Sequence, residues 1–310
     1  MMENVNQMTP AELKAFEKAQ RKANRVPGMF EIIAREVWRD KFAFVCLLLI
    51  IATFVTVYVW GAIMESDPAF GRVRLGTQNI PPSIYGGLGT DQAGRSMLIQ
   101  LVLGARTSLT ITFVVTLSSA FIGYVVGIVA GYFGGFVDWM IMRSIEIVTL
   151  VPTIILIIVL TAVIPNYDTP HFILILIFTT WFGTALSFRA RVLQESAKDY
   201  VSASKTLGTP NWKIMLKKIL PNVTSFLMVG LVLGLAGNIG LETGLTAIGR
   251  GLPFRTPSLG AIIVNAMDPM VLRTRLWQWV PAVVFIVVLT LAINGLGRAV
   301  SRAVNPRKRR

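Results

Sequence analysis

The sequence is poor in the residues on which most catalytic and metal-binding sites depend. Its 310 residues include one cysteine, Cys46, and one histidine, His171. One cysteine cannot form a disulfide within the chain, and one histidine supports neither a Ser-His-acid triad nor a histidine-rich metal site. No Gly-Lys dipeptide occurs, so the chain lacks the P-loop that binds nucleotides. We therefore expect no catalytic site, no metal and no cofactor bound by this chain.

Charged residues are also scarce, and long apolar runs replace them. The composition is 54% apolar and 15% charged, and the mean hydropathy is +0.63. Residues 42–64 contain no charge and would form a helix about 35 Å long, enough to cross a hydrocarbon core of about 30 Å. Five similar runs follow, at about 107–133, 140–164, 172–188, 223–248 and 277–296. The sequence predicts an all-α integral membrane protein with six transmembrane helices.

Acidic residues number 16 against 30 Lys and Arg, which gives a net charge of +14. If six spans alternate the loops between two sides, 22 of these bases fall on one side and 8 on the other. Cytoplasmic loops are enriched in Lys and Arg, so we expect both termini and the loop at 189–222 to be cytoplasmic, in the cell membrane. The charge also favours contact with anionic lipids. No nucleic-acid-binding motif accompanies it, so a nucleic-acid partner is not expected.

Two acidic residues fall inside the predicted spans, where a carboxylate must face protein or water. Glu146 follows Arg143 by three residues, a spacing that favours a local ion pair, although a place in a pathway stays open. Glu242 lies in the fifth span, and two interpretations are equally open for it. Its side chain lines a pathway, or it ties neighbouring spans together.

Glycines mark a close helix contact in the second span. Gly123, Gly127 and Gly131 recur every four residues, which places them on one helix face where a neighbouring backbone can approach. No internal repeat is visible, so the sequence gives no support to a secondary transporter built from inverted repeats.

A polar segment, "DYVSASKTLGTPNWKIMLKKILPN", separates the fourth and fifth apolar runs. It predicts a helix, a turn at Gly208 with positive φ, and a second helix capped by Thr209 with Pro210 at its first position. We expect Pro221 to end this second helix before the fifth span. By physical chemistry alone, the helix pair either lies on the lipid surface or contacts another protein.

This segment resembles the EAA loop of ABC-importer permeases, with Ser in place of Glu and of the second Ala. The matching positions are Ser202, Ala203, Ser204, Gly208, Leu220 and Pro221. Four further stretches occur in the same order as in the C-type permeases of oligopeptide and dipeptide importers: "GTDQAGRS", "GARTSL", "GIVAGYFGGFVDWMIMR" and "KILPN". The resemblance covers roughly residues 88–305.

The resemblance implies a type I ABC importer permease fold and half of a translocation pathway for peptides. It implies as partners a second, B-type permease, two cytoplasmic ATPases that use ATP and Mg²⁺, and an extracellular substrate-binding lipoprotein. The coupling contact with an ATPase would involve Asp199, Tyr200, Ser202, Ala203, Ser204, Leu207, Gly208, Leu220 and Pro221. Similar permeases carry nickel or other small solutes, so that alternative stays open. An ion-coupled secondary transporter and a non-transporting scaffold are the alternatives from other classes.

The expected organisation follows the predicted spans. A cytoplasmic amphipathic arm occupies 1–41, the first span 42–64, an outer segment 65–105, the permease domain 106–299 with its coupling loop at 189–222, and a basic tail 300–310. In the outer segment, Asp91 and Arg95 are four residues apart and would pair on a short helix. We expect this helix to dock the binding protein or, as an equal alternative, to plug the outer side.

Overall fold

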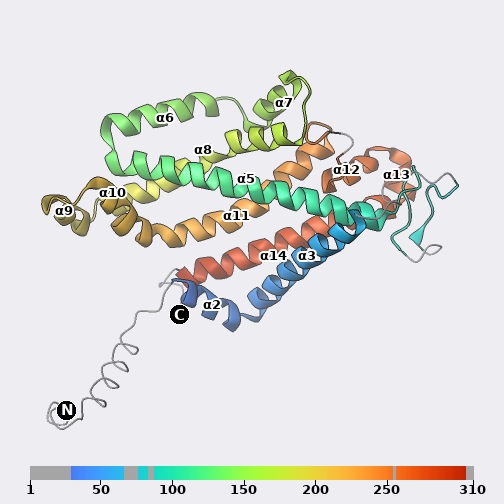
Figure 1. Cartoon of the computed structure of the whole chain (residues 1–310), viewed down its shortest axis with the longest axis horizontal. Coiled ribbons are helices and arrows are strands. Elements are labelled where there is room, and N and C mark those ends of the chain that lie inside the picture. Colours follow the sequence, from blue (N-terminus) through green and yellow to red (C-terminus); the bar gives the residue numbers. More distant parts are fainter. Residues whose placement is uncertain (1–28, 66–75, 83–86, 254–255, 305–310) are drawn as a thin grey trace, which may run out of the picture.

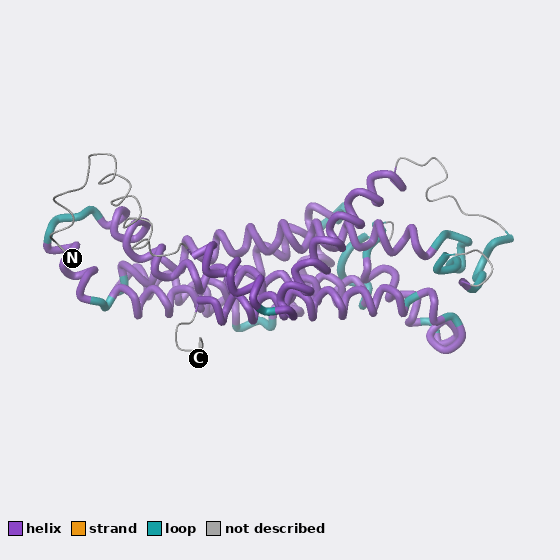
Figure 2. The backbone as a smooth tube through the Cα atoms, turned by 90° about the horizontal axis from the view of Figure 1, so that it is seen from below, coloured by secondary structure: helices purple, strands orange, loops and turns teal. Residues whose placement is uncertain are grey.

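The computed structural model describes residues 29–65, 76–82, 87–253 and 256–304, and it shows an elongated bundle of helices (Figures 1 and 2). Five helical stretches are long and apolar enough to cross a membrane. A bent pair of helices adds a sixth crossing if the pair is one span. The prediction of an all-α membrane protein is confirmed. Residues 1–28 of the expected N-terminal arm lie outside the described residues.

The long helices match most of the predicted spans and extend several of them. The first is α3 (Lys41–Glu65), the second α5 (Met97–Phe133), the fourth α8 (Thr169–Ser196) and the last α14 (Val280–Val304). Helix α5 begins ten residues before the predicted span, so its first turns extend into the expected outer segment. The length of an apolar run predicts only the part of a helix that lies in lipid. It does not predict helical turns that extend beyond the lipid at either end.

The third predicted span, 140–164, is wrong as a single straight helix. The structure has α6 (Gly135–Thr149) and α7 (Thr153–Val163), which meet at an angle of 74°. Pro152 stands between them, and the residue before a proline is disfavoured in the helical conformation. Because the run carries only Arg143 and Glu146 as charges, and both precede the break, hydropathy alone did not reveal it.

Helices α5 and α8 form the central contact of the bundle, and glycine makes it possible. A Cβ added at Gly127 would lie 2.8 Å from the carbonyl oxygen of Ala185, and one at Gly131 would lie 2.8 Å from that of Arg189. A Cβ at Gly123 would lie 2.7 Å from Thr184. No side chain fits at these distances, so the predicted close approach along one face of α5 is confirmed.

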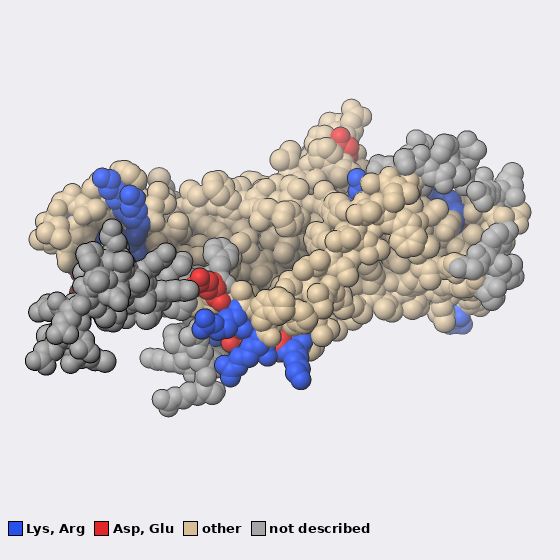
Figure 3. Space-filling view, turned by 60° about the horizontal axis from the view of Figure 1, so that its bottom comes forward, with Lys and Arg blue, Asp and Glu red and all other residues tan. Residues whose placement is uncertain are grey.

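The two ends of the bundle are built differently, and we name them by their contents. The loop end contains α2 (Met29–Arg39), α9 (Asp199–Thr206), α10 (Asn211–Ile214) and the C-terminal end of α14. The cap end contains residues 76–82 and 87–96, α12 (Leu259–Val264), η3 (Asn265–Met267), α13 (Pro269–Thr274) and η4 (Leu276–Gln278). Figure 3 shows a broad region without charged side chains between the two ends, as a membrane-spanning surface requires.

Candidate coupling surface

Helix α9 ends in a tight turn at Gly208. The N–H of Thr209 donates to the carbonyl of Ser204 at 3.1 Å, and the N–H of Gly208 donates to that of Lys205 at 3.0 Å. This bond pair is the Schellman motif, which needs a left-handed residue, and Gly208 has φ +73°. The predicted turn is confirmed. The turn is followed by α10 (Asn211–Ile214).

The second helix of the segment begins and ends differently from the prediction. Thr209 is not the N-cap and Pro210 is not the first helical residue, because Pro210 is extended and α10 begins at Asn211. Pro221 does not end the helix. The π-helical turn η2 (Met215–Ile219) joins α10 to α11 (Leu220–Ala247), and 211–247 form one continuous helical stretch.

The π turn explains why proline is tolerated. Proline has no N–H to donate, and it breaks an ordinary helix because its ring displaces the carbonyl four residues earlier. Here the turn before Pro221 is wider, and the N–H of Leu220 reaches the carbonyl of Met215, five residues back. The shift from i→i−4 to i→i−5 hydrogen bonds thus falls just before Pro221, which has no N–H and could not form a helical hydrogen bond in any case. Such π turns are rare and occur often at functional sites.

One face of the segment is part of the protein core. Val201 of α9, Ile214 of α10 and Ile219 of η2 are fully buried. They pack with Val223 at the start of α11 and with side chains of two further helices: Ile128 and Tyr132 of α5, and Phe188 and Val192 of α8. The segment is therefore packed against the ends of three long helices and is not a loose loop on the lipid surface.

Polar contacts reinforce this packing at two points. Buried Glu195, near the end of α8, accepts hydrogen bonds from Lys198 at 2.7 Å and from the Tyr200 hydroxyl at 2.9 Å. The same hydroxyl accepts from Asn222 of α11 at 3.1 Å, so it links α8, α9 and α11. Burial raises the pKa of Tyr200 above its ordinary value. At the second point, Tyr132 of α5 donates to Asn211 at 2.8 Å.

These polar residues are the part of the site that the sequence did not reveal. Glu195 reads as one more charge in a polar helix end, and Tyr132 as one more aromatic residue in an apolar span. Only the position of Tyr200, at the second residue of α9, was a signal, because the resemblance already placed it in the coupling segment.

The opposite face of the segment is exposed and apolar. Leu207 is 84% exposed, Trp212 54% and Leu216 52%. Lys205, Lys213 and Lys217 are exposed around them. Of the other positions in the resemblance, Asp199, Ser202, Ala203 and Pro221 are exposed, and Ser204 and Leu220 are half-buried. An exposed apolar patch with a polar rim is typical of a protein contact.

The two intramembrane acids occupy different environments. Glu242 of α11 is fully buried and accepts hydrogen bonds from Thr243 at 3.2 Å and Thr246 at 3.4 Å, with Ser108 of α5 as a further partner. Helix α12 packs on the same place, because a Cβ on Gly260 would lie 2.7 Å from the carbonyl oxygen of Thr243. This geometry favours the role of tying helices together over that of lining a pathway.

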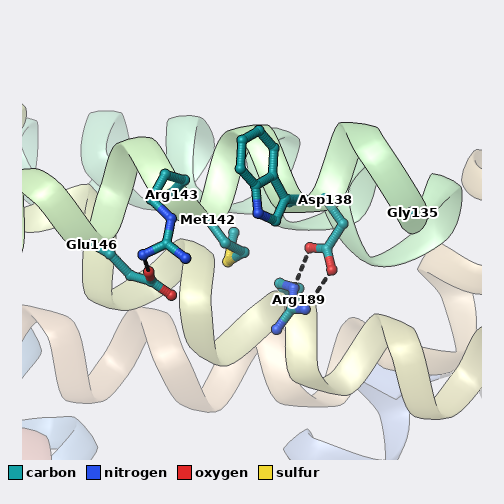
Figure 4. Close-up of a pocket in the computed structure, with 7 residues that line it drawn as sticks. Gly135, Asp138, Met142, Arg143, Glu146 and Arg189 are labelled. Carbon is teal, nitrogen blue, oxygen red and sulfur yellow. Dashed lines mark hydrogen bonds and ion pairs between the residues drawn. The ribbon is translucent and has the colours of Figure 1, made fainter.

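Glu146 is exposed and pairs with Arg143 at 2.9 Å, as its spacing predicts. Both line a small hollow between α6 and α8, in which Asp138 and Arg189 form a second ion pair (Figure 4). Each arginine faces a carboxylate, so the hollow carries compensated charge. Among the described residues, no cluster of three or more His, Cys, Asp or Glu side chains has the arrangement of a metal site.

Asp91 and Arg95 do pair, at 2.9 Å, but not on a helix as predicted. They lie in a turn that closes with the bridge between Thr90 and Ser96. The Asp91 carboxylate is buried and accepts from the backbone N–H groups of Ala93 and Arg95 at 2.9 and 2.8 Å, and from Gln100 at 2.9 Å. Aspartate commonly closes turns in this way, and its short side chain competes with helix formation.

The comparison with known proteins agrees with this architecture. Residues 123–310 match the family model described as "Binding-protein-dependent transport system inner membrane component". The chain belongs to this permease family. The permease is 38% identical over 277 residues to the oligopeptide transport system permease protein OppC of Lactococcus lactis subsp. cremoris, a match that covers 89% of this chain and 94% of the relative.

Further relatives extend the match to almost the whole permease. It is 31% identical over 313 residues to the dipeptide transport system permease protein DppC of Bacillus subtilis, with 99% of this chain and 96% of the relative covered. It is 32% identical over 229 residues to the inner membrane ABC transporter permease protein YejE of Escherichia coli, with 74% and 66% covered. These alignments confirm the resemblance, and they identify the permease as a multi-pass inner membrane protein.

Proposed function

We propose that this permease forms half of the translocation pathway of an ATP-driven importer for di- and oligopeptides. The names of its relatives support a peptide substrate and do not favour a secondary transporter or a scaffold. A second permease would complete the pathway. Two partner ATPases would use ATP and Mg²⁺, and an extracellular binding protein would deliver the peptide.

The two-faced segment at 199–221 carries the proposal. Its buried face is anchored to α5, α8 and α11, while Leu207, Trp212 and Leu216 present an apolar patch to a partner. A groove on an ATPase would cover that patch. Because 211–247 form one helical stretch, a displacement of the patch moves α11 with it and so shifts the spans between two arrangements.

Orientation follows from the same assignment. The loop end and both termini would lie in the cytoplasm, and the cap end outside, where the half-exposed Arg95 would contribute to the surface that docks the binding protein. In a Cys46→Ala background, Ala197→Cys and Arg273→Cys lie at opposite ends. An impermeant thiol reagent should label only Arg273→Cys in intact cells. Labelling of Ala197→Cys in intact cells would contradict this orientation.

The test of coupling uses two exposed tryptophans. Trp212→Ala removes the centre of the apolar patch, whereas Trp139→Ala removes a side chain of similar exposure (57%) from α6. In cells that carry the complete transporter, Trp212→Ala should lower ATPase copurification and the uptake of labelled di- and oligopeptides at least tenfold, and Trp139→Ala should not. Equal retention of the ATPase by both variants would contradict the coupling role. A different outcome separates the substrate from the coupling role. If Trp212→Ala loses the ATPase but the wild type takes up no peptide, only the proposed substrate is contradicted.

A further inference from the structure

The connection between α2 and α3 forms a sharp elbow at Asp40. Its N–H donates to the carbonyl of Glu36 at 3.0 Å and completes α2, while its carboxylate accepts from the N–H of Phe42 at 2.9 Å and caps α3. One residue thus ends the first helix and begins the second. The elbow lies at the loop end of the bundle, apart from α9 in the view of Figure 1.

The inner side of the elbow is fixed to α14. Val37 and Ala43 are buried against Ala299. Arg302 of α14 forms ion pairs with both Glu36, at 4.0 Å, and Asp40. Arg302 therefore compensates one of these two acidic charges from within the protein, and one negative charge stays at the elbow against the three bases of its outer side.

The outer side of the elbow carries three basic residues and a tryptophan. Arg35, Trp38 and Arg39 share one face of α2, since they are three and four residues apart, and Lys41 begins α3. All four side chains are exposed, with Trp38 at 71%. Within the described part of the chain, none of the three bases forms an ion pair. Glu31 lies one turn earlier on the same face. Its single negative charge does not balance the three bases, so this surface keeps a net positive charge.

This basic surface is continuous with the lipid-facing side of α3. Phe42, Val45 and Leu48 are each at least half exposed and follow one another at helical spacing up the span. Tryptophan is enriched at the boundary between hydrocarbon and headgroups, and Lys and Arg there reach the phosphates. An exposed tryptophan on the same short segment as three exposed bases, next to the first residue of an apolar stripe, matches the boundary of a bilayer.

We propose that the elbow surface, formed by Arg35, Trp38, Arg39 and Lys41, binds the phosphate headgroups of anionic phospholipids. The occupant is a lipid and not a protein, because the surface leads directly into the lipid-facing stripe of α3. Through Arg302 the bound lipid would also hold the end of α14. This site is independent of the coupling surface and of transport.

The test measures lipid binding by the purified full chain in detergent. Addition of phosphatidylglycerol should raise the melting temperature, since a ligand that binds only the folded state stabilises it. Phosphatidylcholine and glycerol phosphate should not, and added salt should weaken the effect. If glycerol phosphate gives the same rise, the site takes free phosphate and the proposal is wrong.

Variants identify the site. Arg35→Ala with Arg39→Ala and Lys41→Ala should weaken the apparent affinity for phosphatidylglycerol by about tenfold to a hundredfold, because each base near an anionic surface contributes about fivefold. The matched control replaces Arg250, Arg273 and Arg275 of the cap end by alanine and should keep the wild-type affinity. Equal affinities of the two triple variants would overturn the proposal.

A charge-conserving variant guards against a folding defect in the triple variant. Arg35→Lys with Arg39→Lys keeps the three positive charges and should retain affinity within about threefold of the wild type. Loss of affinity in Arg35→Lys with Arg39→Lys would contradict recognition by charge. This conclusion holds even if the triple alanine variant is unstable without lipid.

Discussion

The loop end and the cap end of the bundle differ in how their short segments are attached to the long helices and to one another. At the loop end, fully buried Val201, Ile214 and Ile219 fix the coupling segment to three long helices. At the cap end, Leu259 and Val271 are fully buried as well, and hydrogen bonds join the turns to one another. Gln278 donates to Asn79 at 3.0 Å and to the carbonyl of Thr90 at 3.1 Å, and the Trp277 indole donates to the same carbonyl at 3.2 Å.

The difference suits different tasks. Apolar packing has no preferred direction and keeps its contacts when a whole segment moves as a body. Hydrogen bonds between turns depend on distance and angle, so they hold one arrangement and weaken steeply outside it. The loop end is thus suited to transmit a displacement and the cap end to keep one geometry. Changes at the two ends should therefore have different consequences.

The largest effect is expected from Gly208→Val at the loop end. Gly208 has φ +73°, and nothing lies within 4 Å of the position that a Cβ would take, so the change acts through backbone strain of about 1–3 kcal/mol and not through a clash. Uptake and stimulation of the ATPase should be abolished while the chain stays in the membrane. The control is Gly208→Asn, because asparagine tolerates positive φ, and it should keep most activity. Normal transport by Gly208→Val would show that this turn does not couple.

A smaller effect, on stability and not on coupling, is expected from Asp91→Ala at the cap end. The change leaves two backbone N–H groups and the Gln100 amide without their acceptor, at a cost of about 3 kcal/mol. The melting temperature of the chain should fall, and ATPase copurification should not change.

Arg95→Ala is the matched comparison, since its side chain is half exposed and its removal should cost about 1 kcal/mol. If it lowers affinity for the binding protein while the melting temperature falls less than in Asp91→Ala, docking is supported. If neither variant changes stability, the structural role of this turn is wrong.

The smallest effect is expected from Tyr200→Phe, which removes one hydroxyl between α8, α9 and α11. The loss should be about 1 kcal/mol of folding stability and a several-fold decrease in ATPase stimulation by loaded binding protein. Tyr58→Phe removes a similar bond, to Thr110 at 2.8 Å, from the contact of α3 with α5. It should leave ATPase stimulation unchanged, and an equal loss in both variants would argue against a special role for Tyr200.

The sequence predicted what depends on composition over many residues or on a repeated spacing. Uncharged runs located the spans, and the spacing of Gly123, Gly127 and Gly131 located the contact between α5 and α8. The turn at Gly208 followed from the one residue type that accepts its geometry.

The features that were missed depend on a single local choice. Pro152 and Pro221 offer the same signal, yet one separates two helices and the other lies inside a continuous one, because only the second follows a π turn. The spacing of Asp91 and Arg95 fits both a helix and a turn, and the turn forms because the carboxylate finds backbone N–H groups to accept from. Such outcomes are decided by hydrogen-bond partners that the sequence alone does not identify.

The separation of the two faces of the coupling segment has a consequence for its evolution. Packing depends on Val201, Ile214 and Ile219, whereas partner contact would depend on Leu207, Trp212 and Leu216, and no residue belongs to both sets. Substitutions on the outer face can therefore accumulate without a loss of folding. Ser202, where the family pattern has glutamate, lies on that exposed face. A lineage can in this way adapt to a diverging ATPase while its core keeps the same residues.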